Sequence, residues 1–486
     1  MFSLASAAVF LASLLAGTVA GDDGAEGTKV WAVVAYVNHG ERTPFIGGLQ
    51  TVLTPEGAQQ MWRQGNAFRN RYLTGSSNGS RSDGAAPIQK ISANVLDNTQ
   101  VAVVSQSNDW VVGSAMAFMQ GLYPPRTDAF VAAAGGEDLG RNLANGTSET
   151  NYPLGGYQYP MIRTLSPQES SFVASQGGLV CFNRRREIAN NLNNSQSMQE
   201  AIKQHKSFYH GLFSSPPLQG LMPLDRAGYE NALDIYELVD YMYNHNQTVY
   251  DRLEDAQNTL DTLQALAFTA ERARISPPSG SSDEKLDTLY SVAGRTLATQ
   301  LARLVLSATG SEGRAGSKMA FLFGSMRPLL SFLSVAGLLT SGNASSSRLS
   351  RLPEPGASIV LEVISSGPFN ASTPLPETDA LQVRFSYKPS ADSNAAFERH
   401  PLFGSGSTMP YRAFIRQMRL EGVTPLQWCD VCGAGSVLRV GGRDEPAPAD
   451  TARIMTSDVD RTPRRQEDDG DGISITGMPV KAREGV

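Results

Sequence analysis

The sequence VWAVVAYVNHGERTPFIGG, from Val30 to Gly48, combines an apolar run with a polar loop. Its first part, Val30–Val37, is an apolar run too dense for a strand with one face in water, and is typical of a strand covered on both faces in a parallel sheet. The run ends in a loop bounded by glycine and proline, which presents His39 and Arg42 three positions apart. Ligands of α/β proteins bind at the carboxyl ends of the strands. The stretch therefore predicts a site on this loop.

Strands and helices are expected to alternate after this loop. Thr54 and Pro55 open LTPEGAQQMWRQGNAFRNRYL as N-cap and first helical residue. A second buried strand at 101–106 (VAVVSQ) precedes a helix at 114–125 (SAMAFMQGLYPP), which two prolines end. The sheet resumes at 318–325 (KMAFLFGS), and the strands ASIVLEVIS and ALQVRFSYK come later. This alternation predicts an α/β fold with a mainly parallel sheet flanked by helices.

Composition shifts set the expected domain boundaries. Residues 1–20 contain an apolar segment followed by small residues, which is typical of a secretory signal peptide and too short to span a membrane. Residues 21–440 are expected to form one domain. Strong helical periodicity within 126–310 predicts a mostly helical insertion beside the sheet. Residues 441–486 are charged, rich in proline and poor in large apolar side chains, so the tail is predicted to be disordered.

The signal pattern predicts a secreted, extracellular glycoprotein. The N-x-S/T glycosylation sequons are Asn78, Asn145, Asn193, Asn246, Asn343 and Asn370. The cysteines are Cys181, Cys429 and Cys432. The close pair in WCDVCG resembles a redox C-x-x-C, but no thioredoxin-like βαβ pattern surrounds it. A local disulfide between Cys429 and Cys432 is therefore predicted, which leaves Cys181 over.

Charge and motifs exclude several partners. A net charge of -6 and a pI near 5.6 argue against a general affinity for nucleic acid or anionic membrane. The tail has no apolar run of about 18 residues that could anchor it in a membrane. The sequence shows no metal-ligand cluster and no Gly-rich phosphate loop, so no metal or cofactor is expected. The oligomeric state is left open.

The loop motif NHGERTP (38–44) resembles the R-H-G-x-R-x-P signature of the histidine acid phosphatases, the branch of the histidine phosphatase superfamily that includes phytases. The segments LTPEGAQQMWRQGNAFRNRY, SAMAFMQGLYPP and MAFLFGSMRPLLSFLSVAGL are similar to three further family segments, in family order. The resemblance implies a phosphoglycerate mutase-like fold and hydrolysis of phosphate monoesters through a phosphohistidine. It makes His39 the nucleophile, Arg42 a phosphate-binding residue, and a small phosphate or phosphomonoester the ligand.

The chain departs from the family pattern at four positions, which are Asn38, Trp110, Ser325 and Met326. Asn38 and Trp110 stand where the family has arginines. Ser325 and Met326 stand where it has a His-Asp pair that binds the phosphate and protonates the leaving oxygen. Losing one oxyanion donor costs ~10²–10³ in rate, and a general acid contributes about 10²–10⁴. The site is therefore predicted to be degenerate, with weak or absent activity.

Two other hypotheses stay open. Arg327 follows the lost histidine by two residues, and Asp109 precedes Trp110. These two are candidate substitutes, Arg327 as a phosphate donor and Asp109 as an acid, and would make the protein an active acid phosphatase with relocated groups. Alternatively, a pocket with Trp110 at its wall would suit a non-catalytic protein that binds an apolar or sugar-like ligand.

Overall fold

The computed structural model describes residues 28–75, 85–129, 152–166, 169–277, 282–310, 316–339, 348–367, 374–392 and 394–433. The expected signal peptide (1–20) and tail (441–486) lie outside these residues, as do the sequons at Asn78, Asn145, Asn343 and Asn370. Residue contacts divide the chain into a unit Met1–Arg439 and a second unit Val440–Val486. All described residues belong to the first unit.

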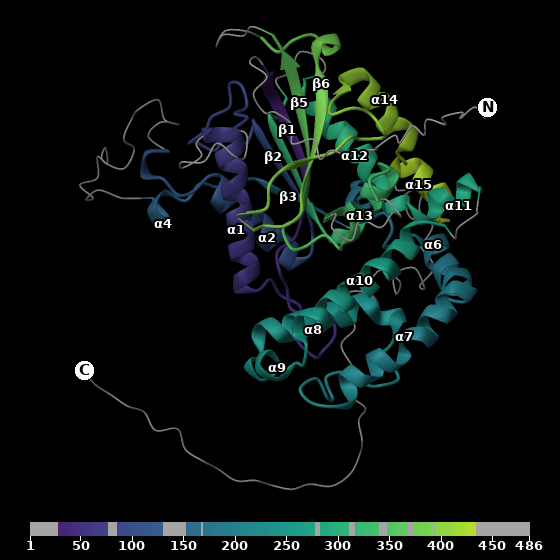
Figure 1. Cartoon of the computed structure of the whole chain (residues 1–486). Coiled ribbons are helices and arrows are strands. Elements are labelled where there is room, and N and C mark those ends of the chain that lie inside the picture. Colours follow the sequence, from purple (N-terminus) through teal and green to yellow (C-terminus); the bar gives the residue numbers. More distant parts are fainter. Residues whose placement is uncertain are drawn as a thin grey trace, which may run out of the picture. The chain divides into compact units, whose positions relative to one another are not determined.

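An eight-stranded sheet forms the centre of this unit (Figure 1). Its strands are β1 (Thr28–Asn38), β2 (Val101–Gln106), β3 (Ile162–Leu165), β4 (Met319–Gly324), β5 (Ser358–Ser366), β6 (Gln382–Lys388), β7 (Glu398–Arg399) and β8 (Met409–Pro410). Their order is β3-β2-β4-β1-β5-β6-β7, and β8 pairs with β6. β1 is parallel to β4 and antiparallel to β5, and β6 is antiparallel to β5. Among the six strands longer than two residues, β5 alone runs in reverse, which confirms a mainly parallel sheet.

β1 is covered on both faces, as its continuous apolar run predicts. One core contains its residues Val33, Ala35 and Val37, with side chains of the helices α1 (Pro55–Arg69) and α2 (Asp109–Leu122). The other core contains Ala32, Val34 and Tyr36, with side chains of α12 (Val292–Ala308), α13 (Met326–Val335) and α14 (Tyr411–Glu421). Successive side chains of a strand point to opposite faces, so a strand buried on both sides needs apolar residues at every position.

Helices lie on both faces of the sheet and in a separate block. The longer helices are α1 (Pro55–Arg69), α2 (Asp109–Leu122), α7 (Gln196–Ser214), α8 (Ala232–His245), α10 (Ala256–Ile275), α12 (Val292–Ala308), α13 (Met326–Val335) and α14 (Tyr411–Glu421). The shorter ones are η1 (Asn70–Thr74), α4 (Pro153–Gly156), η3 (Ser170–Phe172), α5 (Val173–Gln176), α6 (Phe182–Glu187), η4 (Ile188–Leu192), η5 (Tyr229–Asn231), α9 (Gln247–Arg252), α11 (Glu284–Tyr290), η6 (Arg348–Ser350), η7 (Thr378–Ala380) and α15 (Pro425–Cys432). As expected, the Thr54 hydroxyl caps α1 by accepting from the Gly57 amide.

The helical block has a core of its own. Side chains from α7, α8, α9 and α10 share one buried cluster, which includes Tyr209, Leu233 and Phe268. The range 126–310, expected to be mostly helical insertion, contains this block. It also contains β3, which pairs with β2, and α12, which packs on β1. These two elements belong to the sheet layers.

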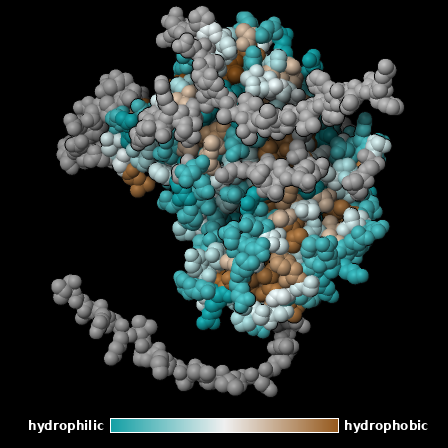
Figure 2. All heavy atoms as spheres, viewed as in Figure 1, coloured by the Kyte–Doolittle hydropathy of each residue, from teal (hydrophilic) through white to brown (hydrophobic). Residues whose placement is uncertain are grey.

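The outer surface of the helical block is mainly hydrophilic on the face shown in Figure 2, with apolar side chains in small patches. Within the described ranges, we find no helix with both the length and the apolar character needed to cross a bilayer.

The predicted disulfide between Cys429 and Cys432 is wrong. Cys432 is bonded to Cys181 instead, and Cys429 is a free thiol. The reason is that both cysteines of WCDVCG lie on α15, where side chains three positions apart have Cβ atoms about 5–6 Å apart. A disulfide needs a Cβ separation of roughly 3.5–4.5 Å. Cys432 is buried beside Trp428 and Cys181, whereas the Cys429 thiol donates to the Pro425 carbonyl.

A buried ion cluster joins the sheet to η1. Glu362 of β5 is fully buried and accepts from Arg71, from Arg384 of β6 and from the Tyr72 hydroxyl at 2.7 Å. Burial alone would raise the pKa of Glu362, but the Arg71 and Arg384 charges outweigh it and lower the pKa to about 2. The carboxylate is therefore charged in the folded protein at any pH above this value.

We expect Cys181→Ser to lower the free energy of unfolding by about 2–5 kcal/mol, because the disulfide closes a loop with a sequence separation of 251. Cys429→Ser is the matched control and should leave the urea midpoint almost unchanged. Mapping of unreduced peptides should find Cys181 linked to Cys432. A Cys429–Cys432 link, or a larger loss in the Cys429 variant, would contradict the assignment.

Glu362→Gln should destabilise the fold by about 3–5 kcal/mol near neutral pH, because two buried arginines lose their shared counter-charge. The lowered pKa of Glu362 in the folded protein adds to the free energy of unfolding. This contribution is complete above pH 4.5, the ordinary pKa of a glutamate, and is lost as the pH falls toward 2. Urea unfolding at pH 6 and pH 3 should therefore show a smaller pH effect in the variant than in the wild type. Equal pH effects would disprove this prediction.

Candidate active site

The His39 loop is held by backbone hydrogen bonds where β1 ends. The Asn38 amide donates to the Ala357 carbonyl at 2.8 Å, and the His39 amide donates to the Gly324 carbonyl, at the end of β4, at 3.0 Å. The Gly356 amide donates to the His39 carbonyl at 3.0 Å. These bonds place His39 at the carboxyl ends of two adjacent parallel strands, next to Ser325. This is the position in which sheets of this class bind ligands.

Two helices close on the loop at Gly40. The Gly40 amide donates to the Ser114 hydroxyl of α2 at 3.0 Å, and that hydroxyl donates to the Trp110 carbonyl at 2.6 Å. A Cβ atom at position 40 would collide with the carbonyl oxygen of Gly57 in α1. Glycine is therefore required here by the close approach of α1, and the segments NHGERTP and SAMAFMQGLYPP meet in space.

His39 is a neutral base in this setting. Burial lowers the pKa of its imidazole to about 3, and the Arg42 charge acts in the same direction; the hydrogen bond to the Gly40 carbonyl opposes both only in part. The Nδ1 atom lies 2.7 Å from that carbonyl oxygen. A carbonyl only accepts, so Nδ1 carries the proton and Nε2 keeps its lone pair. The imidazole is thus in the protonation state that a nucleophile needs.

Arg42, by contrast, is already engaged within the protein. Its Nη2 donates to Glu237 Oε2 of α8 at 2.8 Å, and its Nη1 donates to the Thr43 carbonyl at 3.1 Å. The guanidinium carbon lies 3.6 Å from the centroid of the Phe45 ring. The side chain is only 7% exposed. Its positive charge is therefore neutralised by a carboxylate of the protein.

Helix α8 brings further carboxylates to the loop. Asp240 is electrostatically close to Glu41, Glu354 and Glu237. Burial raises the pKa of Asp240 to about 6, and the charges of these neighbours add to the increase. Glu41 in turn binds Nε2 of His245, the last residue of α8, at 2.8 Å. The surroundings of Arg42 are thus acidic, which disfavours a phosphate dianion.

The four positions that depart from the family pattern supply no replacement cation. Asn38 is buried and donates through Nδ2 to the Glu354 carbonyl at 3.0 Å. Trp110 packs edge-on against Phe45, with ring centroids 5.8 Å apart. Ser325 is the N-cap of α13 and makes no capping hydrogen bond through its side chain, while Met326 packs against the core of the helical block. None of these side chains carries a positive charge.

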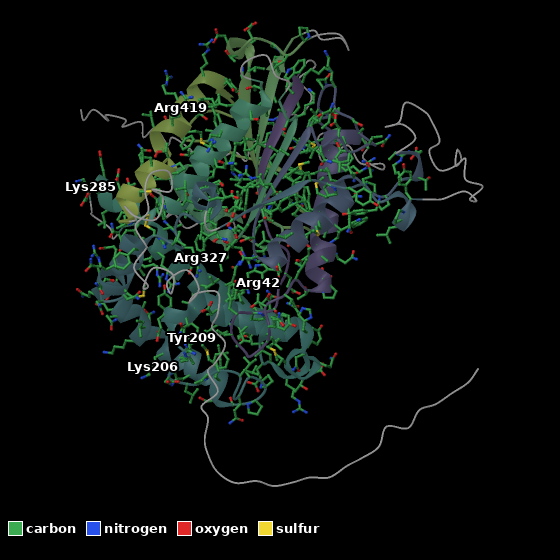
Figure 3. The ribbon with its side chains drawn as sticks, turned by 180° about the vertical axis from the view of Figure 1, so that it is seen from behind. Arg42, Lys206, Tyr209, Lys285, Arg327 and Arg419 are labelled. Carbon is green, nitrogen blue, oxygen red and sulfur yellow. A yellow bond between two sulfur atoms is a disulfide. The ribbon has the colours of Figure 1, made fainter. Side chains whose placement is uncertain are left out.

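The two candidate substitutes differ in position. Arg327, in the first turn of α13, donates to the buried Glu271 from Nε at 2.8 Å and from Nη2 at 3.2 Å. Figure 3 shows Arg42 and Arg327 between the sheet and the helical block. Asp109 is exposed at the start of α2. Arg327 therefore lies near the site but is paired, and Asp109 lies on the surface.

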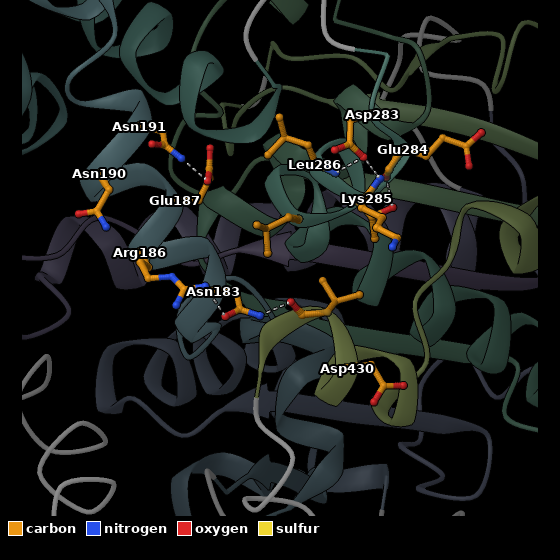
Figure 4. Close-up of a pocket in the computed structure, with 13 residues that line it drawn as sticks. Asn183, Arg186, Glu187, Asn190, Asn191, Asp283, Glu284, Lys285, Leu286 and Asp430 are labelled. Carbon is orange, nitrogen blue, oxygen red and sulfur yellow. Dashed lines mark hydrogen bonds between the residues drawn. The ribbon is translucent and has the colours of Figure 1, made fainter.

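A separate cavity of 840 Å³ lies between α6, η4, α11 and α15 (Figure 4). It is lined by Asn183, Arg186, Glu187, Asn190, Asn191, Asp283, Glu284, Lys285, Leu286, Thr288, Leu289, Asp430 and Val431. Charges of both signs line it, and several polar groups bind one another, such as Asn191 and Glu187 at 2.6 Å. It contains none of the predicted site residues. Among the residues placed by the structure, no group of His, Cys, Asp and Glu side chains could hold a metal ion.

A mainly parallel sheet, a histidine loop at the end of its central strand and a helical block are together the features of the phosphoglycerate mutase-like fold. The model of the histidine phosphatase superfamily (branch 2) matches residues 26–387, and the chain belongs to this superfamily. A comparison with curated proteins finds no match.

Solved structures of phytases resemble the chain over most of its length. The phytase from Citrobacter braakii has a TM-score of 0.50 at 14% identity, and the match covers 82% of this chain and 99% of that one. For the Klebsiella sp. ASR1 phytase the TM-score is 0.51 at 13% identity, with 83% and 97% covered. The multiple inositol polyphosphate phosphatase of Bifidobacterium longum, solved in complex with phosphate, has a TM-score of 0.48 at 12% identity, with 84% and 96% covered. At such identities the phytase matches show the fold alone.

Glu237 and the acidic face of α8 were not predicted from the sequence. The helical periodicity of LDIYELVDYMYNH indicates a helix, and its acids recur at positions 234, 237 and 240. That spacing alone indicates a helix face exposed to solvent. Only the docking of α8 on the His39 loop shows that one of these acids pairs with Arg42.

The neutral state of His39 predicts a flat NMR titration. We expect its ring resonances, assigned by their loss in His39→Ala, to stay constant from pH 4.5 to pH 8, because the pKa lies near 3. Arg42→Gln removes one of the causes and should move the midpoint upward. A wild-type midpoint between pH 5 and pH 8 would contradict the lowered pKa of the imidazole.

Proposed function

We propose that the chain is a secreted, glycosylated histidine phosphatase-like protein whose phosphate monoester hydrolysis is weak or absent. The observation that carries this proposal is the Arg42–Glu237 ion pair of 2.8 Å. In phosphoryl transfer, catalysis depends largely on cationic donors that stabilise charge on the phosphoryl oxygens. Here the retained arginine of the signature loop is bound to a carboxylate of the protein.

The other residues around His39 support the same proposal. Asn38 and Trp110 stand where the resemblance implies arginines, and neither carries a charge. Ser325 and Met326 replace the family's distal donor and acid, and Met326 has no proton to give. His39 itself is well placed and neutral. A nucleophile without charge stabilisation and without a leaving-group acid would turn over slowly.

Secretion and glycosylation rest on the signal-peptide pattern and the sequons. Two sequons lie within the described residues, at Asn193 and Asn246, and both side chains are partly exposed. Asn246 caps α9 by accepting from the Thr248 and Val249 amides through Oδ1. A glycan is attached to Nδ2, which these two bonds leave unused. Both positions are thus compatible with modification.

A non-catalytic binding protein is the second candidate. The observation that favours it is the aromatic pair of Phe45 and Trp110 beside Arg42, in which Phe45 is 54% exposed. Exposed aromatic faces bind apolar and sugar-like ligands. The alternative of an active acid phosphatase with relocated groups has less support, because Arg327 is paired with Glu271 and Asp109 lies on the surface.

The test is hydrolysis of 4-nitrophenyl phosphate at acidic pH by the wild type, His39→Ala and an intact relative such as the Citrobacter braakii phytase. We expect wild-type turnover at least several orders of magnitude below that of the relative, by the magnitudes for lost donors and a lost acid, about 10²–10³ and 10²–10⁴. These losses are not additive within one site. Asn38→Arg alone should not restore activity. Efficient wild-type hydrolysis that His39→Ala abolishes would reject the proposal.

A further inference from the structure

The contact between Glu237 and Arg42 joins two parts of the chain that are 195 positions apart in sequence. Arg42 follows the central strand, and Glu237 lies on α8 in the helical block. A guanidinium binds carboxylates and phosphates through the same N–H donors and with similar geometry. The Glu237 carboxylate therefore takes the place of an oxyanion on Arg42.

We propose that Glu237 determines the specificity of this site: its carboxylate occupies the oxyanion position on Arg42 and makes the site reject phosphate. This inference deepens the proposed function and concerns the same residues. It adds that the rejection of phosphate depends on a single side chain, that of Glu237. Removal of the Glu237 charge should therefore create phosphate binding without creating catalysis.

The contacts of Arg42 limit where an incoming anion can bind its guanidinium. Nη2 binds Glu237, Nη1 binds the Thr43 carbonyl, and the Phe45 ring covers one face of the guanidinium. The Nε atom is buried and makes no hydrogen bond. An anion that binds the guanidinium at Nη2 therefore meets the negative charge of Glu237.

Glu237 is the more exposed residue of the ion pair. Its side chain is 28% exposed, against 7% for Arg42, so its removal opens the arginine on the solvent side. Glu237 also acts electrostatically on Arg327, at the start of α13. Loss of its charge thus makes the potential more positive at the ends of both β1 and β4. Glu41 and Asp240 stay nearby, which sets the expected gain at about one order of magnitude or more.

The probe is inorganic phosphate, titrated by calorimetry into the full chain at one fixed pH and ionic strength. Glu237→Gln should lower the Kd for phosphate at least tenfold relative to the wild type. Glu200→Gln, which makes the same change on an exposed residue of α7, is the matched control and should leave the Kd unchanged. The double variant Glu237→Gln/Arg42→Gln should lose the gained affinity.

Three outcomes would overturn the inference: no gain in Glu237→Gln, an equal gain in Glu200→Gln, or a gain that persists without Arg42. Glu237→Ala repeats the test with a shorter side chain, and thermal melts establish that each variant is folded. Binding of phosphate requires no turnover. The result is therefore distinguishable from a failure of the proposed function, which would appear as wild-type hydrolysis.

Discussion

The position of β1 between β4 and β5 is the constraint from which the rest of the site follows. β1 is hydrogen-bonded on both edges and buried on both faces, so the positions of its last residues are fixed. The amides of Asn38 and His39 donate to the segments on either side. The loop that follows must then pack under α1, which requires Gly40, and against Ser114 of α2. None of these contacts depends on catalysis. They explain how the His39 geometry is maintained beside Asn38, Trp110, Ser325 and Met326.

Charge pairing determines which cations of this site are available to a ligand. A cation that is to bind a ligand anion must be available to it, and a pair with a protein carboxylate removes that availability. Arg42 is paired with Glu237, and Arg327 with the buried Glu271. Asp240 lies close by, with a pKa raised to about 6 by burial and by neighbouring carboxylates. These two arginines therefore link α8 and α10 of the helical block to the segments that follow β1 and β4, and contribute to structure.

Sequence patterns predicted the elements that depend on interactions between residues close together in the chain. The dense apolar run predicted a doubly covered β1, and Thr54 with Pro55 predicted the start of α1. Features set by docking between distant segments could not be derived in this way. The pairing of Cys181 with Cys432 depends on the helical form of α15, and the Glu237 contact depends on which face of α8 meets the loop.

Trapping of a phosphohistidine tests the proposal that His39 is positioned as a nucleophile but is phosphorylated far more slowly than in an intact relative. The wild-type chain would be mixed with 4-nitrophenyl phosphate, quenched in alkaline denaturant, digested and examined by mass spectrometry, alongside an intact phytase. At the same mixing time, we expect a phosphorylated histidine in the phytase and none on the peptide that contains His39. A phosphorylated His39 that forms in the wild type, and is absent from His39→Ala, would contradict it.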